Sequence, residues 1–190
     1  MLNQFFDESA RVIVGLNKHI EIIEKIANHI EQVNNNGGKI LIAGNGGSCA
    51  DAMHFAGELS CTFKSPSRKA FNAISLTSNP VAITAWTNDF GFESFYSRQV
   101  QAFGKSGDLL FLISTGGGDR EKGYSMNLVS AAETAKKFGL TVVSLIGKSG
   151  GELKKISDVS IVVTSSNTAH IQQAHITIIH AICELLERGD

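Results

Sequence analysis

The sequence has few cysteines, little net charge and no long apolar run. Cys49, Cys61 and Cys183 are odd in number and lack CxxC spacing, which favours a reducing cytoplasm and a role in apolar packing. The net charge of −1, with dispersed lysines and arginines, argues against nucleic acid or an anionic membrane as the main partner. No apolar run reaches the roughly 18 residues of a membrane span. Asp7 and Glu8 interrupt the N-terminus, so we expect no signal peptide.

What is present is the composition of a globular protein, with 43% hydrophobic and 18% charged residues in a chain of 190. Residues 3–34 place apolar side chains at helical spacing, which predicts one long amphipathic helix, or two with a break near Gly15. We expect residues 1–36 to form a helical arm and 37–190 the main domain. The apolar stripe of the arm would pack on its own domain or form a subunit interface, and the sequence favours neither.

Five short apolar runs alternate with helical stretches along the rest of the chain. Each run is apolar throughout, as expected of strands covered on both faces. The pattern predicts an α/β fold in which a five-stranded parallel sheet is flanked by helices in a three-layer sandwich. The expected strands are 39–43, 73–76, 109–114, 141–146 and 159–163, and the expected helices 49–62, 79–87, 92–103, 126–138 and 169–187.

Two glycine-rich loops follow expected strands, at 44–48 and 114–118. Ligands of parallel sheets bind beyond the carboxyl ends of the strands, and glycines allow the backbone to approach a ligand closely. The first loop also opens a helix, whose free N–H groups favour an anion. It is not a dinucleotide fingerprint, because Cys49 stands where a glycine is required. A tight connection without a ligand is the alternative for either loop, but two such loops on one edge favour phosphate binding.

His54 and Glu58 lie four residues apart on the helix after the first loop, and so on one face. The pair would hold a divalent metal or place a base beside an acid, although a surface hydrogen bond is the commoner outcome. Gln172 and His180 lie on the last helix, eight residues or about 12 Å apart. They would reach one metal only if their side chains lean inward or come from separate subunits.

Asn88 and Asp89 interrupt two helical stretches. One interpretation is ordinary capping at the start of the second helix. The other is that their amide and carboxylate groups face the hydroxyl groups of a polyol.

Taken in order, these pieces resemble the SIS-domain (sugar isomerase) superfamily, and within it the phosphoheptose isomerases, over nearly the whole chain. The matching segments are GNGGSCADAMHFAGEL (44–59), NDFGFESFYSRQV (88–100), IST (113–115), GKSGG (147–151) and IQQAHITIIH (171–180). The resemblance implies a SIS-type, flavodoxin-like fold and a homotetramer with active sites at subunit interfaces. It also implies a phosphosugar substrate and one divalent metal per subunit, expected to be zinc.

The resemblance further implies a reaction, the isomerisation of sedoheptulose 7-phosphate to D-glycero-D-manno-heptose 7-phosphate. This reaction leads to the heptose of lipopolysaccharide or capsule. Glu58 would be the base and His180 its acid–base partner, although a tight metal ligand is not a free base. The implied metal ligands are His54, Glu58, Gln172 and His180. The implied substrate-binding residues are Asn45, Gly46, Gly47, Ser48, Glu58, Asn88, Asp89, Ser114, Thr115, Gly116, Ser125 and Gln172.

The chain departs from the family pattern in two places. The second loop commonly reads S-T-S-G-N-S-x-N, whereas here three glycines follow Thr115 and about six residues are inserted before Ser125. The family's arginine is also missing at Thr62. Lys64, or Arg120 and Lys122 in the insertion, would be replacements. Both departures concern substrate binding rather than the metal.

Two other functions compete with this interpretation. One is a non-catalytic SIS-domain binding protein of the kind that associates with a replication initiator. The complete set of four metal-ligand types argues against it, because a binding module does not need them. The other is an isomerase of a different phosphosugar, which the altered second loop keeps open.

Overall fold

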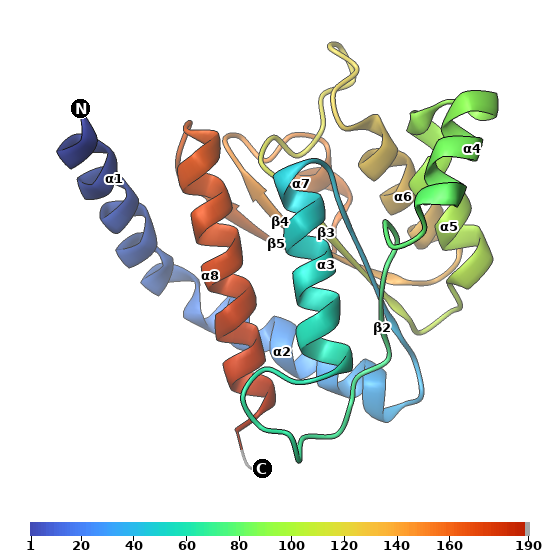
Figure 1. Ribbon diagram of the computed structural model, residues 1–190, viewed down its shortest axis with the longest axis horizontal. Helices are drawn as coiled ribbons and strands as arrows, with labels where there is room; N and C mark the ends of the chain where they lie inside the picture. Colours follow the sequence, from blue (N-terminus) through green and yellow to red (C-terminus); the bar gives the residue numbers. More distant parts are fainter. Residues whose placement is uncertain (189–190) are drawn as a thin grey trace.

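A parallel sheet forms the centre of the protein in the computed structural model, which describes residues 1–188 (Figure 1). Its strands are β1 (Ile40–Gly44), β2 (Ala73–Ser75), β3 (Leu109–Ser114), β4 (Thr141–Gly147) and β5 (Val159–Val163). They pair in the order β2-β1-β3-β4-β5, and every pair is parallel. This is the flavodoxin-like order, in which the chain reverses direction across the sheet between β1 and β3. The predicted fold class is therefore confirmed.

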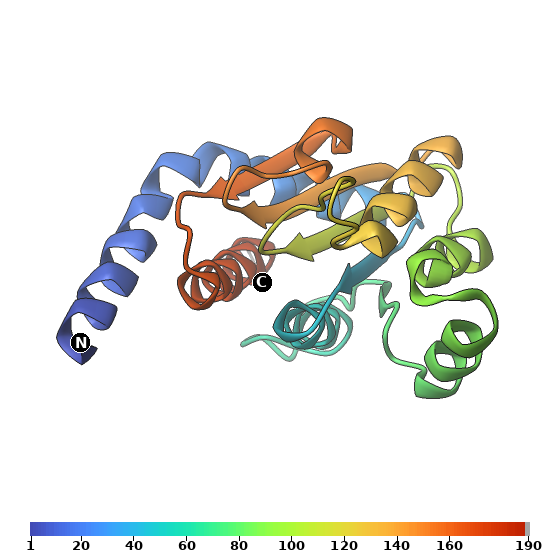
Figure 2. The ribbon, with the colours of Figure 1, turned by 90° about the horizontal axis from the view of Figure 1, so that it is seen from above.

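Helices cover both faces of this sheet, which explains why its strands are apolar throughout. Alternate residues point to opposite faces: Ile40 and Ile42 enter one apolar core, whereas Leu41 and Ala43 enter the other. The first core includes α2 (Ile20–Asn35), α3 (Gly47–Ser60) and α8 (Thr168–Leu186), and the second includes α5 (Phe95–Phe103), α6 (Met126–Lys137) and α7 (Leu153–Ile156). Figure 2 shows α3 and α8 together on one side of the sheet.

The N-terminal segment bends at Gly15, where the sequence predicts a break. Here α1 (Leu2–Val14) gives way to a 3₁₀ segment, η1 (Gly15–His19), which leads into α2. The buried side chains of Ile26 and Ile30 place α2 in the first core. In contrast, α1 extends from one end of the molecule (Figures 1 and 2), and Phe6 on it is 63% exposed. The first helix thus packs partly on its own domain, and its role in a subunit interface stays a prediction.

Two expectations about individual residues are wrong. Asn88 and Asp89 do not cap a helix, because α4 (Pro80–Phe90) continues through them. The chain then turns at Gly91, with φ 82°, into a short 3₁₀ segment, η2 (Phe92–Ser94), before α5. Cys61 is exposed and so does not serve apolar packing. Cys183 does, and its burial raises the pKa of its thiol to about 12.

No helix within the described residues 1–188 is long and apolar enough to cross a membrane.

Candidate active site

The first glycine-rich loop turns sharply from β1 into α3 and brings Gln172 against the start of that helix. Gly46 has φ 58° and ψ −123°, a backbone conformation that favours glycine. A Cβ added at Gly47 would lie 2.4 Å from Nε2 of Gln172, so glycine here allows the amide of α8 to approach. Ser48 is buried beneath the turn. The predicted residues Gly46, Gly47, Ser48 and Gln172 therefore lie together at the carboxyl end of β1.

Asn45 is tied to a residue that the sequence did not single out. Its side-chain amide exchanges two hydrogen bonds with Asn127: Nδ2 of Asn45 donates to Oδ1 of Asn127 over 2.9 Å, and the return bond measures 2.8 Å. Asn127 lies in the first turn of α6 and is buried. The pair fixes the first loop to the helix that follows the second loop. The sequence signal for it is the S-x-N at the end of the family's second-loop pattern, which Ser125 and Asn127 match.

His54, Glu58 and His180 form a cluster between α3 and α8. Nε2 of His54 lies 3.1 Å from Oε1 of Glu58 and 3.1 Å from Nε2 of His180. The ring of Phe63 stacks on His180 at a centroid distance of 5.6 Å. The His54 side chain is 43% exposed and that of Glu58 20%, so the cluster is open to the surface. Two imidazoles and a carboxylate in contact can accept, donate and pass on protons.

Gln172 does not join this cluster within one chain. Helices α3 and α8 run side by side in the same direction (Figure 1), so Gln172 meets Gly47 at the start of α3. His180 meets His54 two turns further along. The structure therefore brings three of the four predicted metal ligands together. The fourth lies about 12 Å away along α8, at 1.5 Å per residue.

The donor atoms of the cluster are of the kinds that zinc prefers. Neighbouring ligands of a tetrahedral zinc lie roughly 3.3 Å apart, given bonds of about 2.0–2.1 Å, and the two contacts of His54 have nearly that spacing. Within residues 1–188, however, no group of three or more His, Cys, Asp and Glu side chains is arranged to hold a metal ion. The residues fit the metal by kind, but one chain does not enclose it.

The second loop is built differently, because its glycines pack against another backbone. A Cβ on Gly117 would lie 1.9 Å from the carbonyl oxygen of Gly150, and one on Gly151 would lie 2.2 Å from that of Gly118. The buried hydroxyl of Ser114 accepts a hydrogen bond from the Gly117 N–H over 3.0 Å. Here the glycines allow loop 114–118 to pack directly on loop 147–151.

Comparison with known proteins decides the family. A family model for the SIS domain matches residues 4–147. Phosphoheptose isomerase from Helicobacter pylori (strain P12) is 42% identical over 168 residues, which are 88% of this chain and 84% of the relative. A probable phosphoheptose isomerase from Thermoplasma acidophilum is 40% identical over 184 residues, covering 97% and 96% of the two chains. The chain belongs to the SIS-domain family, among the phosphoheptose isomerases.

Solved structures agree with this assignment. A phosphoheptose isomerase from Francisella tularensis superimposes with a TM-score of 0.91 at 32% identity, covering 98% of this chain and 96% of that one. The phosphoheptose isomerase GmhA from Neisseria gonorrhoeae gives a TM-score of 0.89 at 36% identity, with the same coverage. The segment inserted before Ser125 and the missing arginine at Thr62 are therefore local differences within the family's shared fold.

The inserted residues fold back as a small hairpin. Asp119 and Tyr124 form an antiparallel bridge with backbone hydrogen bonds of 2.9 and 3.0 Å. Ser125 follows in a left-handed conformation, with φ 53°, and begins α6. The hairpin walls a groove of about 840 Å³ that Gly116, Ser125 and Lys148 also line. Two predicted substrate positions thus border a groove that the insertion has shaped.

None of the expected replacements for the missing arginine is free of a partner. Arg120 forms ion pairs with Glu133 and Glu152, and Lys64 pairs with Glu184. Lys122 lies 3.7 Å from Asp119 in the same hairpin. The structure therefore does not support the interpretation that these cationic side chains bind the substrate.

A buried arginine outside every sequence motif is hydrogen-bonded to the end of α3. Arg68 donates to the backbone carbonyl oxygens of Glu58 and Leu59, at 2.7 and 3.1 Å. It also pairs with Glu187 at 3.3 Å. Because the Glu58 carbonyl is fixed in this way, Arg68 helps to position the carboxylate of the cluster.

The remaining predicted residues lie apart from the cluster. Asn88 donates to Asp89 over 2.9 Å, and both are exposed on the last turn of α4. That helix packs on η2 and α5, away from α8 (Figure 1). Thr115 is half-buried beside Ser114. On α3, burial raises the pKa of Asp51, and the nearby charge of His54 opposes the shift.

Proposed function

We propose that this protein converts sedoheptulose 7-phosphate into D-glycero-D-manno-heptose 7-phosphate. The contact of His54 with both Glu58 and His180 carries the proposal, because it brings two proton-transfer groups together in the structure. The similar proteins that support the family assignment bear the name phosphoheptose isomerase. Interconverting a ketose and an aldose requires moving a proton between C1 and C2. A further proton has to pass between the two oxygens.

Glu58 is proposed as the base that removes the carbon-bound proton. Its side chain is mostly shielded, and Arg68 holds its backbone, so the carboxylate has a restricted position. His180 is the proposed acid–base group for the substrate oxygens, and the stacked ring of Phe63 fixes its plane. Backbone N–H groups at the start of α3, beside Gln172, would bind an anionic group of the substrate.

A divalent metal, proposed to be zinc, would be held by His54, Glu58, His180 and Gln172. When bound, such an ion polarises the carbonyl and hydroxyl oxygens of a sugar. The separation of Gln172 from the cluster in one chain supports a site that a second subunit completes. Glu58 would serve as a base while its coordination is loosened.

The proposed assembly is a homotetramer with active sites between subunits. Helix α4 supports this proposal, because it is largely apolar and yet has no buried residue. Val81 and Phe90 on it are 74% and 65% exposed. A second copy lying over α4 would cover these side chains and bring Asn88 and Asp89 to a neighbouring site. The proposed location is the cytoplasm, and the proposed product use is heptose for lipopolysaccharide or capsule.

The inserted hairpin supports a second candidate, an isomerase of another phosphosugar. The groove of about 840 Å³ beside Gly116 and Ser125 would accept a differently shaped phosphate end. A panel of ketose phosphates from five to seven carbons, assayed under one set of conditions, separates the two candidates. The larger kcat/KM identifies the substrate.

The decisive experiment measures aldose phosphate formed from sedoheptulose 7-phosphate by the zinc-loaded protein. We expect turnover that disappears with a chelator and returns with zinc. Glu58→Gln should lower kcat by at least 10³-fold without changing the oligomeric state, since it keeps the shape and removes the base. Glu184→Gln, on the exposed side of α8, is the matched control and should retain activity. A chain without turnover on any member of the panel would instead be a binding protein.

A further inference from the structure

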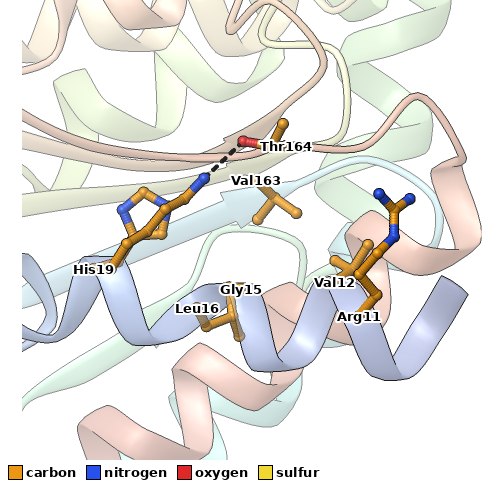
Figure 3. A pocket seen from close by; sticks show the side chains of 8 residues that line it. Arg11, Val12, Gly15, Leu16, His19, Val163 and Thr164 are labelled. Carbon is orange, nitrogen blue, oxygen red and sulfur yellow. Dashed lines mark hydrogen bonds between the residues drawn. The ribbon is translucent and has the colours of Figure 1, made fainter. Parts of the chain in front are cut away.

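A second pocket lies outside the proposed active site, where the bend between α1 and η1 faces the end of β5 (Figure 3). Its volume is about 170 Å³. Its apolar lining comes from two facing segments: Val12, Gly15 and Leu16 lie on the helical side, and Val163 lies on the strand side. The pocket thus opens at the carboxyl edge of the sheet, the edge at which parallel sheets bind ligands.

The polar groups around this pocket are basic. Arg11 and Lys18 line it, and none of its eight lining residues is acidic. Lys18 donates one hydrogen bond to Oγ1 of Thr164 over 2.9 Å, which leaves two N–H bonds of its ammonium group for another partner. Glu8 pairs with Arg11 at 3.6 Å and also lies 3.9 Å from the buried ring of His170, so it partly offsets the charge of Arg11. The pocket therefore has the ammonium group of Lys18, the paired guanidinium of Arg11 and a hydroxyl.

His19 adds a polar atom without a partner. Its Nε2 is buried and has no hydrogen bond among the described residues. Burial lowers the pKa of this imidazole, the charge of Lys18 lowers it further, and a backbone hydrogen bond with Val162 opposes both. The ring therefore has an unused nitrogen. The ring nitrogens of His170 and His175 are also buried without a partner among the described residues, but His19 is the one of these three histidines that lines this pocket, where its nitrogen can meet a ligand.

Gly15 lies at the bend between α1 and η1, but its backbone conformation does not require glycine. Its φ of −62° suits any residue, and a Cβ placed on it would meet nothing within 4 Å. Glycine has a lower helix propensity than alanine, and at this position it relieves no steric clash in return. Besides marking the bend, this glycine leaves the helical side of the pocket open.

We propose that this pocket binds a small phosphate-bearing anion, held by Lys18, Arg11, the hydroxyl of Thr164 and the ring of His19. The pocket, with a volume of about 170 Å³, has room for a phosphate group. The site is separate from the proposed active site and does not depend on its chemistry.

The test follows the His19 ring, because the proposed active site would bind phosphate as well. Inorganic phosphate is titrated into the full-length protein with ¹³C-labelled histidine at constant ionic strength. His19→Gln assigns the resonance. We expect a saturable shift of the His19 signal, at least tenfold weaker binding in Lys18→Gln, and weaker binding in Thr164→Val, which keeps the shape and removes the hydroxyl.

Lys25→Gln is the matched control, since it removes one lysine from α2 outside the pocket. It should bind phosphate as the unmodified protein does. The proposal is overturned if sodium chloride produces the same shift, if the His19 signal does not move, or if Lys18→Gln and Lys25→Gln behave alike. These outcomes do not depend on turnover, so they leave the proposed isomerase activity untouched.

Discussion

The two glycine-rich loops at the carboxyl edge of the sheet look alike in sequence, but Gly47 of the first loop and Gly117 of the second lie against different kinds of atom. In the first loop, a side chain meets Gly47: the flexible amide of Gln172. In the second, the backbone of Gly150 meets Gly117. A side chain can move away from a new methyl group, whereas a packed backbone cannot. Gly47 thus serves the site and Gly117 the fold, whereas Gly44 in the first loop also meets backbone, with a Cβ 2.3 Å from the carbonyl oxygen of Ser48.

The largest effect is expected in the second loop. Gly117→Ala places a Cβ 1.9 Å from the Gly150 carbonyl oxygen at a φ of +73°. Left-handed strain of about 1–2 kcal/mol and overpacking of about 1–3 kcal/mol together predict a loss of roughly 3 kcal/mol in the free energy of unfolding. Urea denaturation measures it. Gly116→Ala, whose Cβ meets nothing within 4 Å, is the control and should stay within about 1 kcal/mol.

A loss of stability of similar size is expected when the pH is lowered, because of a buried histidine on α8. Burial lowers the pKa of His175, on α8, to about 4, and neither of its ring nitrogens has a hydrogen-bond partner among residues 1–188. The unfolded state, with an ordinary pKa near 6.5, binds the proton first, so stability falls as the pH drops from about 6.5 to 4. The contribution is about 3 kcal/mol. Unfolding free energies of His175→Leu should lack this slope, and an unchanged slope would contradict the assignment.

In the first loop we expect activity to suffer rather than stability. Gly47→Ala would push the Gln172 amide aside, because the new Cβ would lie 2.4 Å from Nε2. We expect kcat/KM to fall about 10- to 100-fold, or roughly 1.4–2.8 kcal/mol, since misplacing a binding group raises the barrier. The melting temperature should change little. If Gly47→Ala unfolds as readily as Gly117→Ala, the contrast between the loops is wrong.

The smallest effect concerns the link between the loops. Asn45 and Asn127 exchange two hydrogen bonds, so a double-mutant cycle with alanine should give a coupling of about 1 kcal/mol in unfolding free energy. A coupling near zero would mean that the first loop is held without Asn127. Asn88→Ala, on exposed α4, is a single-site control for removing an asparagine amide.

Local patterns in the sequence sufficed for the sheet and for part of the site. The five strands could be predicted because each is a short apolar run, and the break at Gly15 because glycine interrupts a helical stripe. His54 and Glu58 could be paired because four residues make about one helical turn. Their contact with His180 came from the family resemblance, because the spacing of one helix says nothing about its neighbour.

What could not be predicted depends on contacts between distant segments. Arg68 has no motif, and its importance appears only where it meets the end of α3. The partner of Asn45 depends on how far α6 lies from β1. The glycines of loop 114–118 were interpreted as space for a phosphate, because the sequence does not show that loop 147–151 lies against them. Asn88 and Asp89 were misplaced because α4 ends three residues later than expected.

The alignment of α3 with α8 restricts insertions and deletions in α8 between Gln172 and His180. Gly47 faces Gln172, and seven residues later His54 faces His180. Each residue of an α-helix turns it by about 100°, so inserting or deleting one residue between Gln172 and His180 would carry the imidazole to another side of α8. Substitutions in that segment can be absorbed one at a time, but an insertion or deletion there would separate the two contacts at once.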